Sequence, residues 1–246
     1  MSVASRVRQL LPPRFQPLVR FQYERWRGLL ERELPLFCAM VQPNDLVVDV
    51  GANVGIYMHA LARRGAVVEA FEPQPWCVDV LRAYATSNPR VHVHGAALGA
   101  VPGRAELRVP IVDGRLLRGS ASLVETDRLG TSETIDVEIR TLDSFWFDRV
   151  KAMKIDVEGA EVGVIRGAAA TIERAHPVLL VEIEQRHHGG PIGEVFREIE
   201  GMGYRGEFLL PGKGWRPIAE FRAEVHQRLS DLNDGVYINN FLFKSS

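Results

Sequence analysis

The sequence predicts an α/β protein built on a doubly wound, mostly parallel β-sheet, with an antiparallel strand at its C-terminal end and a helical cap at its N-terminus. From residue 46 onward, short apolar runs alternate with stretches of helical periodicity, which is the pattern of βαβ units. The runs LVVDV (46–50) and VVEAF (67–71) are apolar almost throughout, as expected of strands buried on both faces. The last two apolar runs have no helical pattern between them, so we expect them to pair antiparallel.

The first half of the sheet follows directly from this alternation. After the strand at 46–50 and a turn at Gly51, we expect a helix over 56–64, then the strand at 67–71. Pro75 suits the first turn of the next helix, which Asn88-Pro89 ends before a third strand, VHVHG (91–95).

Residues 97–140 interrupt the alternation. They contain two extended segments around a Gly/Ser-rich loop, GRLLRGSASL (114–123), and we interpret them as an insertion or an elaborated crossover. Regular alternation then resumes, with strands expected at 152–157, 178–184, 204–210 and 236–243 and helices expected from about 161 and over 194–202. The segment 211–235 is longer than a hairpin requires and is predicted to be a lid or a substrate loop.

The N-terminal residues 1–40 are expected to form a helical cap, because FQYERWRGLLERELPLFCAMV offers a broad apolar face. A substrate-gating or dimer-forming role is the alternative. Residues 41–246 then form the main domain, and the length of 246 residues is in the range of one globular domain.

The composition excludes several classes of protein. Thirty basic and 31 acidic residues give a formal net charge of −1, so no net positive charge would attract nucleic acid. Cys38 and Cys77 stand far apart, without the spacing of a zinc site or a disulfide framework. The N-terminus has no uninterrupted apolar region of a signal peptide, and no window reaches the roughly twenty apolar residues of a membrane span. We therefore expect a cytoplasmic protein with no membrane span and no nucleic-acid partner.

A glycine-rich turn follows the first strand in DVGANVG (49–55). Glycine lets the backbone approach a nucleotide-like ligand, because a Cβ atom would clash or strain the chain. The spacing Asp49, Gly51, Gly55 differs from the G-x-G-x-x-G that binds a dinucleotide pyrophosphate. S-Adenosylmethionine has no phosphate, and its ammonium group could be received by Asp49. Ala52 and Asn53 are predicted to contact the same cofactor from the turn.

A second carboxylate, Glu72, ends the next strand, where it could accept hydrogen bonds from both ribose hydroxyls. Each motif alone is weak, because GxxxG spacings and strand-terminal glutamates are common. Together, in order and on adjacent strands, they indicate S-adenosylmethionine as the cofactor. By topology, Ala97 after the third strand would lie near the adenine.

With DVGANVG, FEP (71–73), TLDSF (141–145) and KIDVEGAE (154–161), the sequence resembles the FkbM-type methyltransferase family. GSASL (119–123) is similar to a small-residue motif that this family often carries before TLDS. The resemblance runs from about residue 43 to residue 185. It implies the class I, Rossmann-like methyltransferase fold, S-adenosylmethionine as methyl donor, and methylation of hydroxyl groups on natural products, sugars or glycolipids. Residues 1–40 and 211–235 lie outside it, so it does not specify the acceptor.

Methyl transfer to an alcohol requires alignment of the acceptor and removal of its proton, by a general base or beside a metal ion. Asp156 is our first candidate for a catalytic or cofactor-contacting role, because it ends a buried strand at the edge where ligands bind; helix capping is its alternative role. Glu158, in the same turn, could bind acceptor hydroxyls or help to hold a cation. His187 follows the fifth strand and is the preferred general base, with His188 as the alternative.

Other acidic and histidine residues receive weaker assignments. A divalent ion held by Asp156, Glu182 and a histidine stays an open alternative, but no tight ligand spacing supports it and no metal site is predicted. Glu161 is expected to interact with the helix dipole or to lie on the surface. His92 and His94 alternate within a strand and are expected to be structural.

These observations predict an S-adenosylmethionine-dependent O-methyltransferase that modifies a hydroxyl of a sugar, a glycolipid or a polyketide-type natural product. We expect a small-molecule or glycan acceptor and a homodimer. N- or C-methylation of a small metabolite is the alternative among enzymes, and a non-catalytic S-adenosylmethionine-binding partner subunit is the alternative of another class. A dinucleotide-dependent oxidoreductase is disfavoured by the spacing of the glycine turn.

Overall fold

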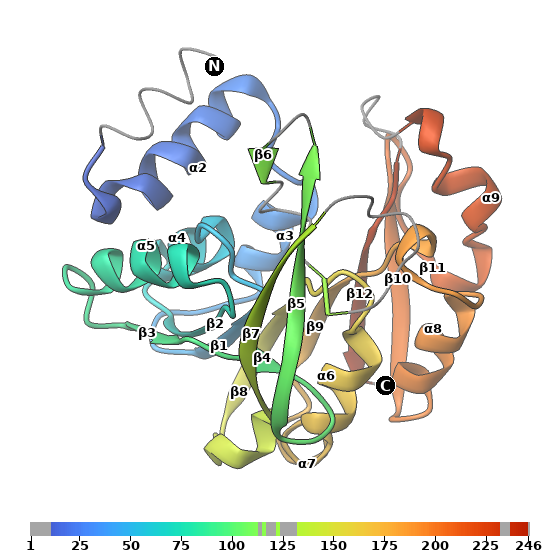
Figure 1. Cartoon of the computed structure of the whole chain (residues 1–246). Coiled ribbons are helices and arrows are strands. Elements are labelled where there is room, and N and C mark those ends of the chain that lie inside the picture. Colours follow the sequence, from blue (N-terminus) through green and yellow to red (C-terminus); the bar gives the residue numbers. More distant parts are fainter. Residues whose placement is uncertain (1–10, 113–114, 117–121, 124–131, 232–236, 246) are drawn as a thin grey trace.

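The fold is given by a computed structural model that describes residues 11–112, 115–116, 122–123, 132–231 and 237–245. An eight-stranded sheet runs through its centre in the order β11-β10-β12-β9-β8-β1-β2-β3 (Figure 1). Its parallel strands are β1 (Leu46–Val50), β2 (Val67–Phe71), β3 (Val91–His94), β8 (Val150–Ile155) and β9 (Val178–Glu182). The predicted doubly wound, mostly parallel sheet is confirmed.

The C-terminal part of the sheet is antiparallel. β12 (Asn240–Ser245) lies between β9 and β10 (Tyr204–Leu210) and pairs antiparallel with both, as expected for the last two predicted strands. A further strand, β11 (Gly214–Pro217), forms a hairpin with β10. Gly212 and Gly214 have positive φ, which allows this tight turn.

The hairpin changes the interpretation of residues 211–235. Their described part contains β11, the 3₁₀ turns η5 (Ile218–Glu220) and η6 (Leu229–Asp231), and the short helix α9 (Ala223–His226). Residues 232–235 lie outside the described residues. The prediction of a lid or a substrate loop is therefore wrong for residues 214–217, because they form a strand that extends the sheet.

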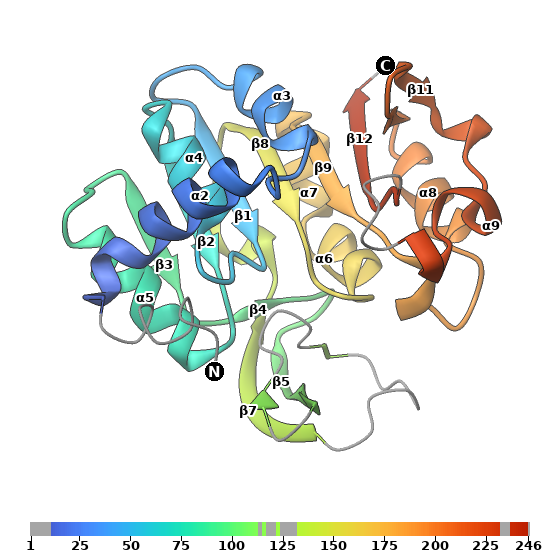
Figure 2. The ribbon, with the colours of Figure 1, turned by 90° about the horizontal axis from the view of Figure 1, so that it is seen from above.

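Helices cover both faces of the sheet. On one face, a hydrophobic cluster joins the sheet to α3 (Glu33–Ala39), α4 (Ile56–Arg63) and α5 (Pro75–Ala85). On the other face, a second cluster joins the sheet to α6 (Glu161–Gly167), α7 (Ala169–Ala175) and α8 (Gly193–Glu200). α2 (Gln16–Arg27) lies across α4 and α5 (Figure 2). Residues 11–40 therefore carry helices as expected, whereas residues 1–10 lie outside the described residues, and a separate cap domain stays a prediction.

Side-chain alternation decides which strand residues face the α3–α5 side. Val47 and Ala152 belong to the cluster beneath α3–α5, and their neighbours Val48 and Met153 belong to the other cluster. Because successive side chains point to opposite faces, Asp49 and Lys154 follow Val47 and Ala152. The strand register pairs Asp49 directly with Lys154. Two polar residues thus meet on the face of the sheet that α3, α4 and α5 cover, near the carboxyl ends of β1 and β8.

The predicted insertion forms an arm with its own sheet. β4 (Ala97–Leu98), β5 (Gly103–Val112), β6 (Arg115–Leu116) and β7 (Ser132–Arg140) are arranged in the order β4-β7-β5-β6, and the arm projects from the main body (Figure 2). Of the Gly/Ser-rich loop, residues 114 and 117–121 lie outside the described residues.

The segment TLDSF holds α7 in place. It forms the 3₁₀ helix η3 (Leu142–Phe145). The Asp143 carboxylate accepts hydrogen bonds from the backbone N–H groups of Ala170 and Thr171, at 3.0 and 2.8 Å. Asp143 therefore satisfies the free N–H groups at the start of this helix. No helix among the described residues is long and apolar enough to cross a membrane.

Candidate active site

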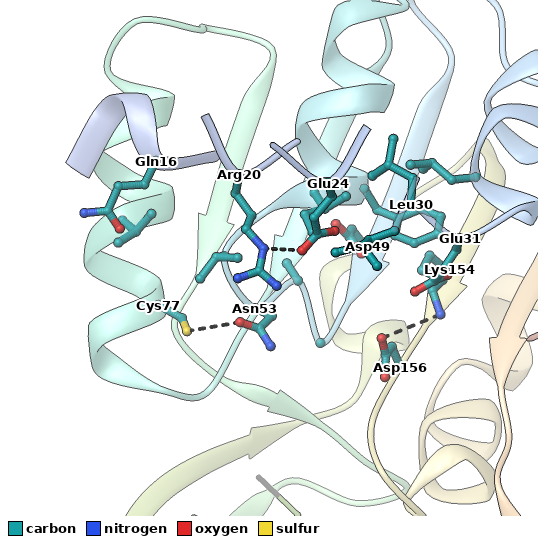
Figure 3. A pocket seen from close by; sticks show the side chains of 18 of the residues that line it. Gln16, Arg20, Glu24, Leu30, Glu31, Asp49, Asn53, Cys77, Lys154 and Asp156 are labelled. Carbon is teal, nitrogen blue, oxygen red and sulfur yellow. Dashed lines mark hydrogen bonds and ion pairs between the residues drawn. The ribbon is translucent and has the colours of Figure 1, made fainter. Parts of the chain in front are cut away.

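A cavity of about 610 Å³ opens at the carboxyl ends of β1 and β8, where ligands bind in open α/β sheets. The turn after β1 and the beginning of α5 line it from below, and α2 with the α2–α3 connection covers it (Figure 3). Its polar lining residues are Gln16, Arg20, Glu24, Glu31, Asp49, Asn53, Lys154 and Asp156.

The glycine turn is shaped by close packing. Gly51 has φ +77°, and a Cβ atom at this position would lie 1.8 Å from the carbonyl oxygen of Asp156. A Cβ at Gly55, φ +85°, would lie within 2.8 Å of side chains from both α4 and α5. The N–H groups of Gly51 and Ala52 donate to the carbonyl of Phe71, at 2.9 and 3.1 Å. The two glycines therefore fix the path of the turn, and β2 anchors it.

Asp49 is a buried acid with one unused oxygen. Its side chain is 2 % exposed, and Oδ2 has no hydrogen-bond partner among the described residues. Burial raises the pKa of the Asp49 carboxyl to about 7, although the Lys154 ammonium opposes this shift. A buried carboxylate oxygen without a partner is costly, so this atom fits a ligand that brings a cation or a donor.

Glu72 lies at the end of β2 and holds the neighbouring loop. Its Oε2 accepts the N–H of Asn53 at 2.7 Å, and its Oε1 accepts the N–H of Gln74 at 2.8 Å. Burial raises the pKa of Glu72 to about 7. Glu72 also lines a smaller cavity of about 70 Å³, together with Ala97 and Asp156. Each carboxylate oxygen can accept a second hydrogen bond, so Glu72 can still receive hydroxyl groups.

Lys154 lines the cavity of the candidate active site, and our sequence-based prediction missed it. Its side chain is 1 % exposed, and Nζ donates to Asn240 Oδ1 at 3.0 Å. Nζ also lies 3.7 Å from the carboxylates of both Asp156 and Glu182. Burial lowers the pKa of Lys154, but the surrounding carboxylates outweigh this effect and raise it above its usual value. A lysine inside the apolar run AMKIDV was the signal that could have revealed it.

Glu31 completes the surroundings of Lys154 from the α2–α3 connection. Its Oε2 accepts hydrogen bonds from the Tyr57 hydroxyl at 2.5 Å and from Asn240 Nδ2 at 3.1 Å. The α2–α3 connection is thereby bonded to α4 and to the last strand. Nothing in the sequence pattern around Glu31 indicated this role.

Asp156 lies where the two cavities meet. It lines both of them and faces Lys154. Burial raises the pKa of Asp156 to about 6; Lys154 opposes this, and the carboxylates of Glu31 and Glu158 add to it. The strand was expected to reach residue 157, whereas β8 ends at Ile155 and Asp156 directly follows it. The carboxyl group of Asp156 can lose or gain a proton near neutral pH.

The predicted base His187 is paired with Glu158, which was predicted to bind acceptor hydroxyls or to help hold a cation. His187 Nε2 lies 2.5 Å from Glu158 Oε2 and 4.0 Å from Glu184 Oε1. Glu184 is in turn held by Arg186, through contacts of 2.7 and 2.8 Å, and by the Tyr237 hydroxyl at 2.6 Å. These bonds outweigh burial and lower the pKa of Glu184. Glu158 lines the smaller cavity, so this pair lies beside Asp156.

A second acid–histidine pair stands next to the first. His188 Nε2 lies 3.0 Å from Glu161 Oε2, and Glu161 Oε1 accepts the N–H of Gly159 at 2.8 Å. Glu161 is the first residue of α6, as the dipole interpretation requires, but it is only 1 % exposed. A surface position for Glu161 was therefore wrong, because His188 and the Gly159 turn enclose it.

Two groups of side chains in the described residues have metal-ligand spacing: Glu31 with Asp156 and Glu182, and Glu158 with Glu184 and His187. The combination considered from the sequence, Asp156 and Glu182 with a histidine, is not the one that the structure brings together. Lys154 already supplies positive charge to the first group, and Arg186 supplies it to the second.

His92 and His94 have the structural role expected of them. They contact the two oxygens of the Glu69 carboxylate on the neighbouring strand β2, each at 2.7 Å. These contacts outweigh burial and lower the pKa of Glu69.

The doubly wound sheet, with acidic side chains at the ends of β1 and β2 around a glycine turn, defines a class I, Rossmann-like domain of the methyltransferase type. The sequence profile described as "Methyltransferase FkbM domain" matches residues 49–205. The chain belongs to this family, which confirms the resemblance found in its motifs.

Individual relatives agree with this assignment. Methyltransferase sdnD of Sordaria araneosa is 28% identical over 162 residues, covering 52% of this chain and 62% of that protein. Methyltransferase 1 of Beauveria bassiana (strain ARSEF 2860) is 24% identical over 153 residues, covering 51% of this chain and 59% of that protein. The chain thus spans about three fifths of the length of these curated relatives.

The fold is also found in a solved structure. Methyltransferase FkbM from Methylobacillus flagellatus KT superposes with a TM-score of 0.52 at 18% identity, covering 88% of this chain and 45% of that chain. At this identity the likeness shows the fold alone.

Proposed function

We propose that the protein is an S-adenosylmethionine-dependent O-methyltransferase that modifies a hydroxyl of a sugar, a glycolipid or a polyketide-type natural product. The observation that carries the proposal is the buried Oδ2 of Asp49 beside the Gly51 turn, which has no hydrogen-bond partner within the described ranges of the chain. Family membership supports it, as do the names of the two relatives, both called methyltransferases.

The residues around the turn fit this donor. Asp49 would accept the ammonium group, Glu72 would accept the ribose hydroxyls, and Ala97 would border the adenine. Gly51, Ala52, Asn53 and Gly55 would form the backbone wall between them. Bound S-adenosylmethionine would supply an electrophilic methyl group on a cationic sulfur.

The acceptor hydroxyl has to lose its proton as it is methylated, and the chain offers two groups for this. Asp156 lies where the cavities meet, and its raised pKa makes it a better base than an ordinary aspartate. The second group is the Glu158–His187 pair, in which Glu158 orients the ring through Nε2 and leaves Nδ1 to take the proton. Glu158 would also balance the charge of the protonated imidazole.

Transfer of a labelled methyl group tests the proposal. The purified chain is incubated with methyl-labelled S-adenosylmethionine and a panel of sugars, glycolipids and polyketide alcohols, and an ether product is expected. Asp156→Asn should lower turnover by about 10² or more, the effect of removing a general base or a positioning group. The matched control Asp79→Asn changes an exposed carboxylate of α5 and should keep wild-type turnover.

Each other outcome points to a named alternative. An amine or a C-methyl product would overturn hydroxyl transfer while keeping the donor. Cofactor binding without turnover on any acceptor, and with no effect of Asp156→Asn, would favour a non-catalytic partner subunit. Loss of turnover on addition of a chelator would assign one of the two acidic groups to a divalent metal.

We further propose a cytoplasmic location, a small-molecule or glycan acceptor and a homodimeric state. The near-neutral charge of the chain supports the choice of a small acceptor over nucleic acid. Sedimentation of the purified chain tests the dimer.

A further inference from the structure

The outer face of α2 carries a continuous apolar stripe. Phe15, Val19, Tyr23 and Trp26 follow one another at intervals of four, four and three residues, so they lie on one side of the helix. All four are exposed, Trp26 at 80 %, and Leu29 continues the line beyond the helix. The other side of α2 faces the protein, with Pro17 buried. We call these five exposed residues the α2 stripe.

The charges beside the α2 stripe are positive. Arg25 and Arg27 border it, and neither has a carboxylate within ion-pair distance among the described residues. The one acid of α2, Glu24, is buried and paired with Arg20 on the cavity side. The exposed face of α2 therefore combines aromatic side chains with cations that have no counter-charge in the part of the chain that the structure describes.

A groove of about 670 Å³ lies between α2, α3 and α4, and Arg25, which borders the α2 stripe, also lines this groove. Phe21, Leu30, Leu34 and Pro35 give it an apolar lining, and four arginines also border it: Arg25, Arg32, Arg63 and Arg64. An apolar channel with cationic edges matches one lipid chain below an anionic headgroup. Leu30, Glu31 and Leu34 also line the cavity of about 610 Å³, so the groove and the candidate active site share a wall.

We propose that the α2 stripe and this groove form a docking surface for an anionic lipid bilayer. Tyr and Trp side chains favour the membrane interface, and arginines beside them attract lipid phosphates. Charge complementarity selects the bilayer over a second copy of the chain, because a two-fold contact would place the arginines of both copies in one interface, and the one acid of α2, Glu24, is buried and paired with Arg20. The proposal goes beyond methyl transfer and does not depend on the methyl acceptor.

Vesicle sedimentation of the full chain tests this surface. We expect binding to vesicles of phosphatidylcholine and phosphatidylglycerol in equal parts, weak binding to phosphatidylcholine alone, and release from the anionic vesicles at high salt. The double variant Tyr23→Ser and Trp26→Ser should lower the partition coefficient by about tenfold or more. Trp146→Ser is the matched control, because Trp146 is equally exposed at 80 % but follows η3, away from α2.

A second pair of variants separates charge from apolar contact. Arg25→Gln with Arg27→Gln should lower binding to anionic vesicles by about tenfold and leave binding to phosphatidylcholine unchanged. Circular dichroism verifies that each variant is folded. The proposal is overturned if the full chain fails to bind anionic vesicles, or if the stripe variants bind as well as Trp146→Ser. It is also overturned if the chain forms a dimer that Trp26→Ser dissociates, which would assign the stripe to a second copy.

Discussion

We expect Asp49 and Glu72 to make donor binding dependent on pH. Burial raises the pKa of each carboxyl to about 7, so both are largely protonated in mildly acidic solution. Each must lose its proton before it can accept hydrogen bonds as a carboxylate, so we expect the cofactor to bind the deprotonated protein. Affinity should fall as the pH drops through 7, by up to about tenfold per pH unit for each carboxyl.

Calorimetry with S-adenosylhomocysteine or S-adenosylmethionine over this range measures the effect. Binding below pH 7 should be accompanied by proton release, which is visible as a dependence of the heat on the buffer. Asp49→Asn should weaken binding at high pH and flatten the profile, since one titrating group is gone. Wild-type affinity that stays constant from about pH 8 to about pH 6 would contradict the assignment of these carboxyls.

Lys154 supplies the positive charge that the buried acids of the site require. In Lys154→Met, the carboxylates of Asp156 and Glu182 lose the ammonium that lies 3.7 Å from each. Removing one partner of a buried ion pair lowers the free energy of unfolding by about 3–5 kcal/mol. We expect a loss of this size in the free energy of urea unfolding at neutral pH, and a smaller loss in acid, where the carboxyls are protonated.

Lys151→Met provides the comparison on the same strand. Lys151 is exposed and should change stability by about 0.5 kcal/mol or less. Equal effects of the two substitutions would show that the ammonium of Lys154 does not stabilise the site.

The turn after β1 requires a glycine at position 51 because of a close backbone contact and not only because of a positive φ. Gly51 and Gly28 both have positive φ, but a Cβ at Gly51 would strike the Asp156 carbonyl, whereas nothing lies within 4 Å of one at Gly28. Gly28→Ala should therefore cost only the backbone strain, about 1 kcal/mol. In Gly51→Ala, the added Cβ atom has to push the ends of β1 and β8 apart. This substitution should therefore lower the free energy of unfolding clearly more than Gly28→Ala does, and it should abolish cofactor binding. Thermal unfolding and calorimetry of both variants measure this, and similar costs would argue against the close approach of the two strands.

How well a strand could be located from the sequence depends on how deeply its side chains are buried. β1, β2 and β9 were located to within two residues, because strands buried on both faces form apolar runs that end where the sheet ends. β11 was missed because GWRP is a short edge strand with intermediate or exposed side chains, and it resembles a loop.

The same reasoning explains which site residues could be foreseen. Asp49, Glu72 and Asp156 lie at or directly after strand ends, so sequence order was sufficient to group them. Glu31 and Asn240 could not be linked, since 209 residues separate two side chains that share a hydrogen bond.

We expect the stability of the whole molecule to respond to the cofactor, because segments far apart in the sequence line the cavity in which we propose that the donor binds. The turn after β1, the end of β8 and the α2–α3 connection all line the cavity, so unfolding destroys the site. A ligand that binds only the folded state stabilises it by about 2.7 kcal/mol at a hundred times its Kd. For a chain of this size, we expect S-adenosylhomocysteine to raise the Tm by roughly 5–10 °C.

Three controls make this shift specific. Asp49→Asn should largely abolish it, because the cavity loses its ammonium acceptor. Tyr23→Ser with Trp26→Ser should retain it, because these side chains lie on the outer face of α2; loss of the shift in this variant would instead place the α2 stripe in donor binding. NAD should leave the Tm unchanged, since the turn spacing does not suit a pyrophosphate. A larger shift with NAD than with S-adenosylhomocysteine would overturn the donor assignment and restore the oxidoreductase alternative.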